Sequence, residues 1–189
     1  MKRIIIFFIL FLTNFTVFAQ VNYEDRNSSG FVSLNIEVKA IDKKPAVFTG
    51  GNCGIIIKDI RLGVFFSGVT SKFKFNDANG SPHSLSCMQG GINIGYPIIK
   101  NKSLRPVADL KLSFGQASTI NTNYERDNNM LFWGITPSIG LEYKISPLFT
   151  IELGINYQYS ILYEPPDIYS KNFLNSFGAY ISFKLGYFY

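Results

Sequence analysis

The chain has 189 residues, of which 47% are hydrophobic, 16% aromatic and only 16% charged. This composition excludes a disordered chain, which needs low hydrophobicity and high charge. It also leaves too few charges to cover an ordinary soluble domain, which carries about 25%. The formal net charge is +5 and no basic cluster occurs, so the sequence gives no indication of nucleic-acid binding.

The N-terminus has the pattern of a secretory signal peptide. Lys2 and Arg3 precede the apolar run 4–12, and the stretch ends at Ala19, which predicts cleavage before Gln20. A membrane-anchor helix is the alternative, but it needs roughly 18 to 20 apolar residues and this run stops after residue 12. No later run approaches that length, so a helical membrane protein is excluded. The expected organisation is a signal peptide 1–19, a polar segment 20–29 and one β-barrel domain 30–189.

Apolar residues in the rest of the chain alternate with a period of two, which indicates strands rather than helices. The clearest case is 32–40, where Val32, Leu34, Ile36 and Val38 share one face and polar residues occupy the other. The pattern predicts eight strands, over 32–40, 46–58, 60–67, 88–96, 104–114, 133–144, 149–161 and 173–189.

The connections between these strands alternate in length. The links 58–59, 99–103 and 145–147 are short, whereas 70–84, 116–129 and 163–172 are long and polar; only the first link, 42–45, breaks the pattern by being brief. Transmembrane barrels have short turns on the periplasmic side and longer loops outside. The fold class predicted is therefore all-β: an eight-stranded antiparallel up-and-down transmembrane β-barrel.

The two faces of the strands differ in a way that places the apolar face toward lipid. The opposing face is rich in Gly, Ser, Thr, Asn and Gln with scattered ions, which suits the narrow lumen of an eight-stranded barrel. We expect these ions to be paired there as a structural polar core, and an ion path is the alternative. The ions are Glu37, Asp109, Glu142, Glu152, Lys39, Arg61, Arg105, Lys111, Lys144 and Lys184.

Aromatic residues lie toward the predicted strand ends, as the interfacial girdles of membrane barrels require, although aromatics also favour strands in general. They are Trp133, Tyr143, Phe149, Tyr157, Tyr159, Tyr163, Phe173, Tyr187 and Tyr189.

The alternation at the end of the chain, through Phe183, Leu185 and Tyr187 to the terminal Tyr189, resembles the small outer-membrane β-barrel proteins of Gram-negative-type bacteria. More narrowly, the Gly-rich segment 45–57, which leads through a tight turn to Leu62 and Gly63, resembles a group of uncharacterised small β-barrel proteins. The resemblance implies an outer-membrane location, contact with outer-membrane lipid, and recognition of the C-terminal strand, ending in Tyr189, by the barrel-assembly machinery.

Catalytic chemistry has one weak candidate. His83, the one histidine, could act as a base with Ser84 or Ser86, and a resemblance to lipid A deacylases and acyltransferases, which are also small barrels, supports that alternative. No third orienting acid is indicated, and His83 lacks the partners of a zinc site. We therefore predict no enzyme, no metal and no cofactor.

The two cysteines, Cys53 and Cys87, form an even pair in a chain bound for an oxidising compartment. The expected strand order places one strand between them, about 10 Å apart at a spacing of about 4.8 Å per strand. That exceeds the limit of roughly 7 Å between Cα atoms for a disulfide. Two separate thiols are predicted.

Three functions stay open. The first is an outer-membrane barrel with a structural, adhesive or surface-interaction role, whose long loops, such as 116–129, meet a partner. The second is the lipid-modifying enzyme. The third is a secreted soluble ligand-binding barrel similar in outline to a lipocalin, which predicts large apolar side chains inside.

Overall fold

The structure is a computed structural model that describes residues 28–41, 44–70, 73–76, 82–99, 103–120, 126–163, 173–186 and 188. The predicted signal peptide 1–19 and most of the polar segment 20–29 lie outside these residues. None of the described residues forms a helix long and apolar enough to cross a membrane.

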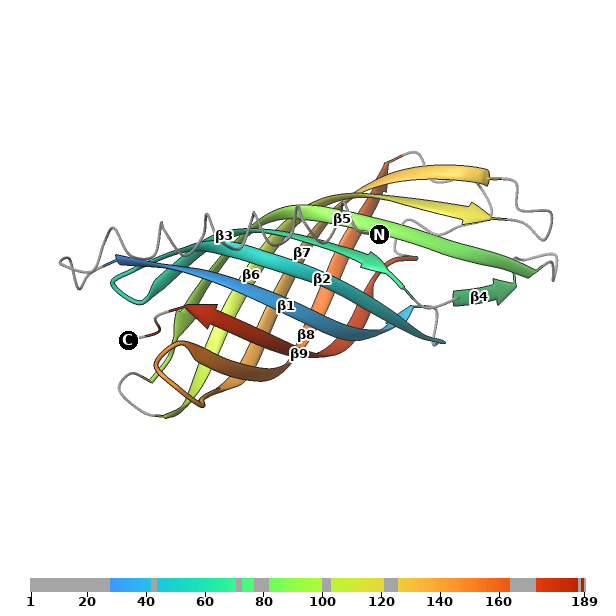
Figure 1. Ribbon diagram of the computed structural model, residues 1–189. Coiled ribbons are helices and arrows are strands. Elements are labelled where there is room, and N and C mark those ends of the chain that lie inside the picture. The colour runs from blue at the N-terminus through green and yellow to red at the C-terminus, as the bar shows by residue number, and fades with distance from the viewer. Residues whose placement is uncertain are drawn as a thin grey trace, which may run out of the picture.

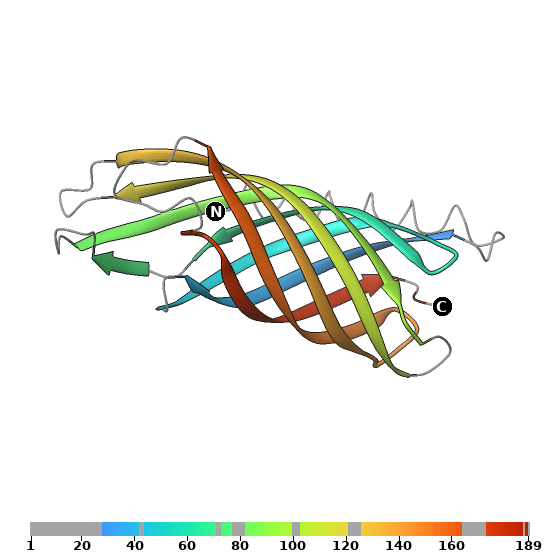
Figure 2. The ribbon, with the colours of Figure 1, turned by 180° about the vertical axis from the view of Figure 1, so that it is seen from behind.

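The described strands close into one antiparallel barrel (Figure 1). Eight long strands form the ring in the order β1-β2-β3-β5-β6-β7-β8-β9, and β9 returns to pair with β1. The strands are tilted relative to the barrel axis, as closure of a barrel requires (Figure 2). Their bounds are β1 Ser28–Ile41, β2 Lys44–Ile57, β3 Ile60–Val69, β4 Phe73–Asn76, β5 Pro82–Pro97, β6 Leu104–Ile120, β7 Arg126–Lys144, β8 Phe149–Tyr163 and β9 Ser176–Gly186. The predicted fold class is confirmed.

The short strand β4 continues the path of β3 along the same neighbour, β5. β3 pairs with β5 as far as Gly68–Met88, and β4 pairs with the same strand from Phe73–Leu85 to Asn76–Pro82. The expectation of a single long loop over 70–84 is therefore wrong. Strand pairing continues into this segment because its apolar residues alternate with polar ones.

The two ends of the barrel differ as expected from the connection lengths. At one end, Lys58 and Asp59 both have positive φ, 48° and 76°, which is the geometry of a two-residue hairpin turn. β5, β6 and β7 are 16, 17 and 19 residues long, more than the roughly 9 to 11 that span a bilayer, and they extend at the opposite end, which we call the long-strand end. The predicted loop 116–129 is accordingly too long, because β6 runs to Ile120 and β7 begins at Arg126.

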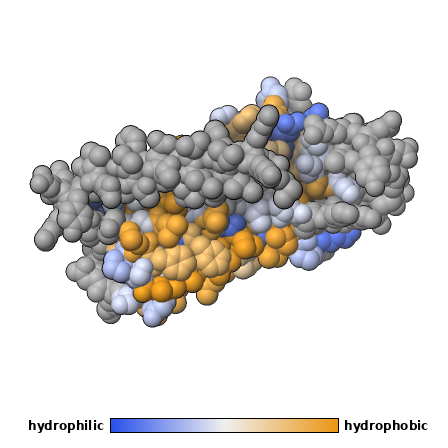
Figure 3. All heavy atoms as spheres, in the orientation of Figure 1, coloured by the Kyte–Doolittle hydropathy of each residue, from blue (hydrophilic) through white to orange (hydrophobic). Residues whose placement is uncertain are grey.

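The large apolar side chains face outward. Leu34, Val64, Ile92 and Leu153 are each more than half exposed, and the space-filling view shows hydrophobic residues gathered on the outer wall with hydrophilic residues toward both ends (Figure 3). Ionic side chains of the same strands are buried. This arrangement confirms the predicted faces. It contradicts the soluble ligand-binding barrel, which needs the large apolar set inside.

The aromatic girdle is confirmed only in part. Tyr143 and Tyr163 are exposed at the ends of β7 and β8, whereas Trp133 lies within β7 and Tyr157 and Tyr159 lie within β8, although these three are also exposed on the outer wall. Phe173 departs from the expectation: it precedes β9 in a turn and packs against apolar residues of the lumen. Tyr187 and Tyr189 lie outside the described residues.

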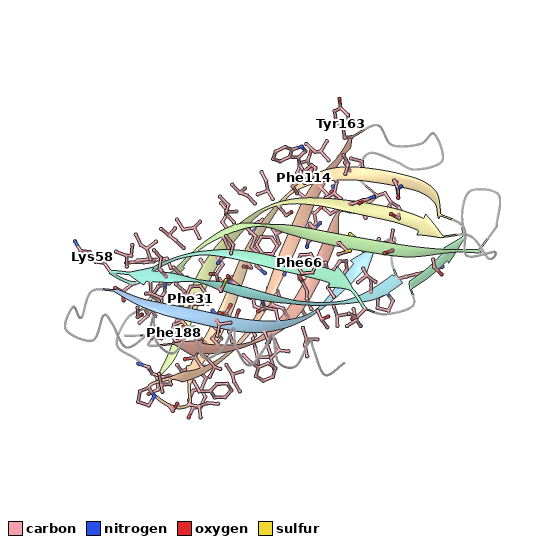
Figure 4. The ribbon with its side chains drawn as sticks, turned by 45° about the horizontal axis from the view of Figure 1, so that its top comes forward. Phe31, Lys58, Phe66, Phe114, Tyr163 and Phe188 are labelled. Atoms are coloured by element: carbon pink, nitrogen blue, oxygen red, sulfur yellow. The ribbon has the colours of Figure 1, made fainter. Side chains whose placement is uncertain are left out.

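The last strand is shorter than predicted. β9 ends at Gly186, whose φ of 156° and whose approach to the carbonyl of Gly30 leave no room for a side chain. The chain then turns so that Phe188 is buried against Phe31, with ring centroids 6.1 Å apart. Figure 4 shows these two rings close together toward the end that carries Lys58. The expected strand to Tyr189 is wrong because Gly186 ends it.

Candidate functional site

The lumen contains most of the ionic side chains that the sequence places there. Glu142, which is fully buried, is held by two arginines from other strands: Arg61 Nη2 lies 2.8 Å and Arg105 Nε 2.6 Å from the same oxygen, Oε2. Lys184 lies 3.4 Å from the other oxygen. One carboxylate therefore joins β3, β6, β7 and β9 across the lumen.

A second carboxylate, Glu152, extends this cluster. It forms an ion pair with Lys184, accepts a hydrogen bond from the Tyr180 hydroxyl, and lies 3.9 Å from Arg61 Nη1. Both carboxylates are shared among cations and donors, which is the condition under which buried charges are tolerated. We name the set Arg61, Arg105, Glu142, Glu152, Tyr180 and Lys184 the central ion cluster.

A separate polar layer lies between the central ion cluster and the long-strand end. Lys39 Nζ donates to Gln158 Oε1 at 2.5 Å and pairs with Glu37 at 3.3 Å. Glu37 also accepts a hydrogen bond from the Asn156 amide, and Gln89 reaches Gln158 at 3.4 Å. The layer thus links β1, β5 and β8 through uncharged amides, which satisfy the ions without further charge.

The remaining predicted ions are less tightly held. Lys111 lies over the rings of Phe65 and Tyr180, at 5.5 and 5.7 Å from their centroids, so aromatic faces offset part of the cost of its burial. Asp109 lines a small cavity between the two polar layers. Lys144, the last residue of β7, is only half-buried.

Both ends of the lumen are closed by apolar residues, which the sequence reasoning missed. At the end with short turns, Phe31, Ile56 and Phe188 form a cluster beneath Arg61, whose guanidinium lies 5.4 Å from the Phe188 ring. A larger cluster fills the opposite end. Its members are Ile41, Ala46, Phe48, Leu85, Cys87, Ala117, Met130, Phe132, Leu162 and Leu174.

The signal for this larger cluster is present in the sequence. In 130–133 and 161–162 apolar residues occupy consecutive positions, and consecutive strand positions face opposite sides. Both faces of these strands are therefore apolar near the long-strand end. The lumen is thus apolar at its two ends, and the predicted polar core of paired ions is confirmed between them.

Little open volume remains between these layers. Two lumenal cavities, one lined in part by Glu37, Lys39 and Gln89 and the other by Asn93 and Asp109, each have about 20 Å³. A cavity of this size holds about one water molecule. Buried amide oxygens such as that of Asn93 have no hydrogen-bond partner among the described residues and are suited to such a water.

The residues considered for chemistry are spread over the barrel. Cys53 lies on β2 and Cys87 on β5, with β3 between them as expected, and both are free thiols. His83 pairs with Phe75 of β4, and Ser84 and Ser86 follow on β5; the His83 side chain lies outside the described residues. Within the described part of the chain, no group of three His, Cys, Asp or Glu is arranged to hold a metal ion.

Comparison with known proteins gives fold relatives only. No protein-family profile and no curated protein matches the sequence. Among solved structures, Neisserial surface protein A is similar with a TM-score of 0.55 and 14% identity over 86% of this chain and 97% of that one. The N-terminal β-barrel domain of Pseudomonas aeruginosa OprF gives 0.55 and 16% over 83% and 97%. Ail, the attachment invasion locus protein of Yersinia pestis, gives 0.51 and 13% over 85% and 97%.

The closed barrel, its apolar outer wall and these fold relatives agree. In a bilayer, only helices and closed barrels satisfy all backbone hydrogen-bonding groups, and this wall is apolar where it would meet lipid. The chain therefore has the fold of a small eight-stranded transmembrane β-barrel, the fold that these outer-membrane proteins share.

Proposed function

We propose that the protein is a non-conducting outer-membrane barrel that presents its long-strand end to a partner. The observation that carries the proposal is the filled lumen. An ion crossing it would have to pass the Phe31 and Phe188 rings, the central ion cluster, the layer around Lys39 and the apolar cluster around Phe132. The cavities of about 20 Å³ between them are far smaller than a channel.

The long-strand end supplies the contact surface. The buried Ser118 donates a hydrogen bond at 2.7 Å to the exposed Asn129 across β6 and β7, and Ser86 of β5 pairs with Ser118, so the outward row of this part of the sheet is polar. A polar sheet cannot lie in hydrocarbon and therefore projects from the bilayer. Loops that a rigid scaffold holds in place are common carriers of binding residues. Two of the similar structures have names in keeping with such a role, a surface protein and an attachment invasion locus protein.

Conductance across a planar bilayer tests the first half of the proposal. The purified barrel is inserted into the bilayer, and an open porin measured in the same way is the positive control. We expect no current steps above the bare bilayer, because every layer of the lumen is packed. A steady ohmic conductance in the wild-type protein would contradict the proposal.

Adhesion of expressing cells tests the second half. Residues 121–125, in the connection between β6 and β7, are replaced by a Gly-Ser segment of equal length, and residues 100–102, at the opposite end, are replaced in the same way as a control. Binding to immobilised sulfated glycans and matrix proteins is then compared. We expect at least a fivefold loss for the first variant and none for the control. Equal binding by both variants and by cells without the protein would refute the surface role.

The proposal includes no catalytic step. The variant His83→Ala is therefore expected to leave lipid A acylation unchanged, as judged by mass spectrometry of lipid A from expressing cells. A change in the acyl-chain number that depends on His83 would instead establish the lipid-modifying alternative.

A further inference from the structure

The outer wall carries an apolar groove of about 440 Å³ across β5, β6, β7 and β8. This volume lies in the range of about 300 to 1,000 Å³ that is typical of small-molecule sites. Its sides are formed by Ile92, Leu112, Phe114, Trp133, Ile135, Tyr159 and Ile161, and its floor by the backbone around Gly90, Gly91 and Gly134.

The groove exists because Gly90 lacks a side chain. Gly90 lies on the outward face of β5, between Phe66 of β3 and Phe114 of β6, to which it is paired. Phe114 in turn packs edge-on against Trp133, with centroids 5.4 Å apart and planes at 68°. The rings of Phe114 and Trp133 project outward beside the space left at Gly90. Phe114 lies on the outside of the ribbon in Figure 4.

The register places the groove just below the polar boundary of the wall. The next outward position on β6 toward the long-strand end is Gln116, which pairs with Met88 and Leu131, and Leu131 pairs with Tyr163. One step farther lies the polar row with Ser118. Polar and tyrosine side chains mark the level of lipid headgroups. The groove therefore lies where the first part of an acyl chain lies, in the leaflet next to the long-strand end.

We propose that this groove binds one acyl chain of a membrane lipid. The wall around it is the lipid-facing surface already described, so hydrocarbon is the medium that meets it. Its lining is almost wholly apolar, which offers nothing to a polar ligand. A second copy of the barrel would present a convex wall, which meets the raised rings of Phe114 and Trp133 before it reaches the floor at Gly90. A slender chain reaches that floor without such a clash.

Trp133 supplies the reporter, because it is the one tryptophan of the chain and forms a side of the groove. The protein in dodecyl-maltoside micelles is titrated with phosphatidylcholine that carries bromine atoms on its acyl chains, and quenching of Trp133 fluorescence is followed. Three proteins are compared: wild type, Gly90→Leu, which fills the groove, and Gly68→Leu. A heat-dependent gel shift verifies that each is folded.

Gly68→Leu is a matched control. Gly68 is also an outward glycine, beside Met88 and outside the groove, and a Cβ there would lie 3.4 Å from the nearest atom, the Cys87 carbonyl. At Gly90 the corresponding distance is 3.3 Å, to the Phe65 carbonyl. Both sites accept a side chain at similar cost, and Gly90→Ala serves as a smaller substitution if Gly90→Leu does not fold.

We expect saturable quenching, with the same half-saturation concentration of lipid for wild type and Gly68→Leu. For Gly90→Leu this concentration should be at least tenfold higher, and for Gly90→Ala it should be intermediate. Equal curves for all proteins, or quenching that rises without saturation, would overturn the proposal, since both indicate general contact with surrounding chains. A change of oligomeric state in Gly90→Leu alone, measured by sedimentation, would assign the groove to a second copy and overturn it as well.

Discussion

Arg61 of β3 and Glu142 of β7 meet across the lumen at 2.8 Å, although neither strand is hydrogen-bonded to the other. Both side chains are almost completely buried. The pair therefore ties opposite parts of the wall together through the interior, which backbone pairing alone does not do. Arg105 joins from β6 and Lys184 from β9, so that a single carboxylate links four strands.

Loss of this carboxylate should be strongly destabilising. In Glu142→Gln the cations Arg61, Arg105 and Lys184 remain buried with one fewer negative charge, and breaking a buried ion pair typically costs about 3 to 5 kcal/mol. We expect a fall of that size in the free energy of unfolding, measured by urea titration in detergent micelles. The double variant Glu142→Gln with Arg105→Gln should recover part of the loss. A change below about 1 kcal/mol would mean that the cluster contributes little.

The position of the hydrocarbon belt predicts a depth-dependent effect of charge. Ile139 and Ile145 are exposed to the same extent, 52% and 50%, but Ile139 lies within β7 and Ile145 in the turn that follows it. An arginine near the midplane costs about 2 to 4 kcal/mol and one near the interface about 0 to 1. We expect Ile139→Arg to lower the free energy of unfolding in lipid vesicles by the larger amount and Ile145→Arg by the smaller. Equal losses in the two variants would show that Ile139 does not lie deeper in the hydrocarbon region than Ile145.

The turn at Gly186 should not accept a side chain. A Cβ there would lie 2.6 Å from the Gly30 carbonyl and 2.8 Å from the Phe31 Cβ, on a backbone with φ of 156°. We expect Gly186→Ala to destabilise the barrel by about 1 to 3 kcal/mol, the usual cost of such strain. Gly51→Ala is the control, because its Cβ would have only an ordinary contact of 3.4 Å. Equal urea midpoints for the two variants would argue against the inward turn.

The cysteines should remain separate and differ in reactivity. Cys87 is buried in the apolar end of the lumen, whereas Cys53 is half-buried and pairs with Val32 and Val64, which lie on the outer wall. The intact mass measured without reductant should correspond to two thiols. An apolar maleimide in detergent should label Cys53 in the folded protein and Cys87 only after unfolding. A mass lower by two hydrogens would contradict the strand order.

Much of the fold is predictable because period-two alternation is a local property. The run 32–40 specifies both its strand and its outward face, and the short links specify one end of the barrel. Strand ends are harder to place. The extension of β6 to Ile120 depends on pairing with β7, which no local pattern in a polar segment reveals.

The sequence predicts which residues face the lumen. It does not predict which of these residues are in contact with one another. Glu142 and Arg61 are far apart in sequence, and their contact depends on the stagger of the strands, which sets the height of each residue in the barrel. The groove at Gly90 is likewise a product of register. A single outward glycine is unremarkable until the rings of Phe114 and Trp133 are placed beside it.

The contact between Phe31 and Phe188 bears on the order in which the barrel assembles. Phe31 belongs to the first strand and Phe188 follows the last, so the two rings meet only when β1 and β9 come together. Their packing is thus a consequence of closing the seam and cannot precede it. Burial of the chain's last apolar ring under Arg61 is coupled to completion of the cylinder, which favours the closed ring over any open sheet that leaves this seam unpaired.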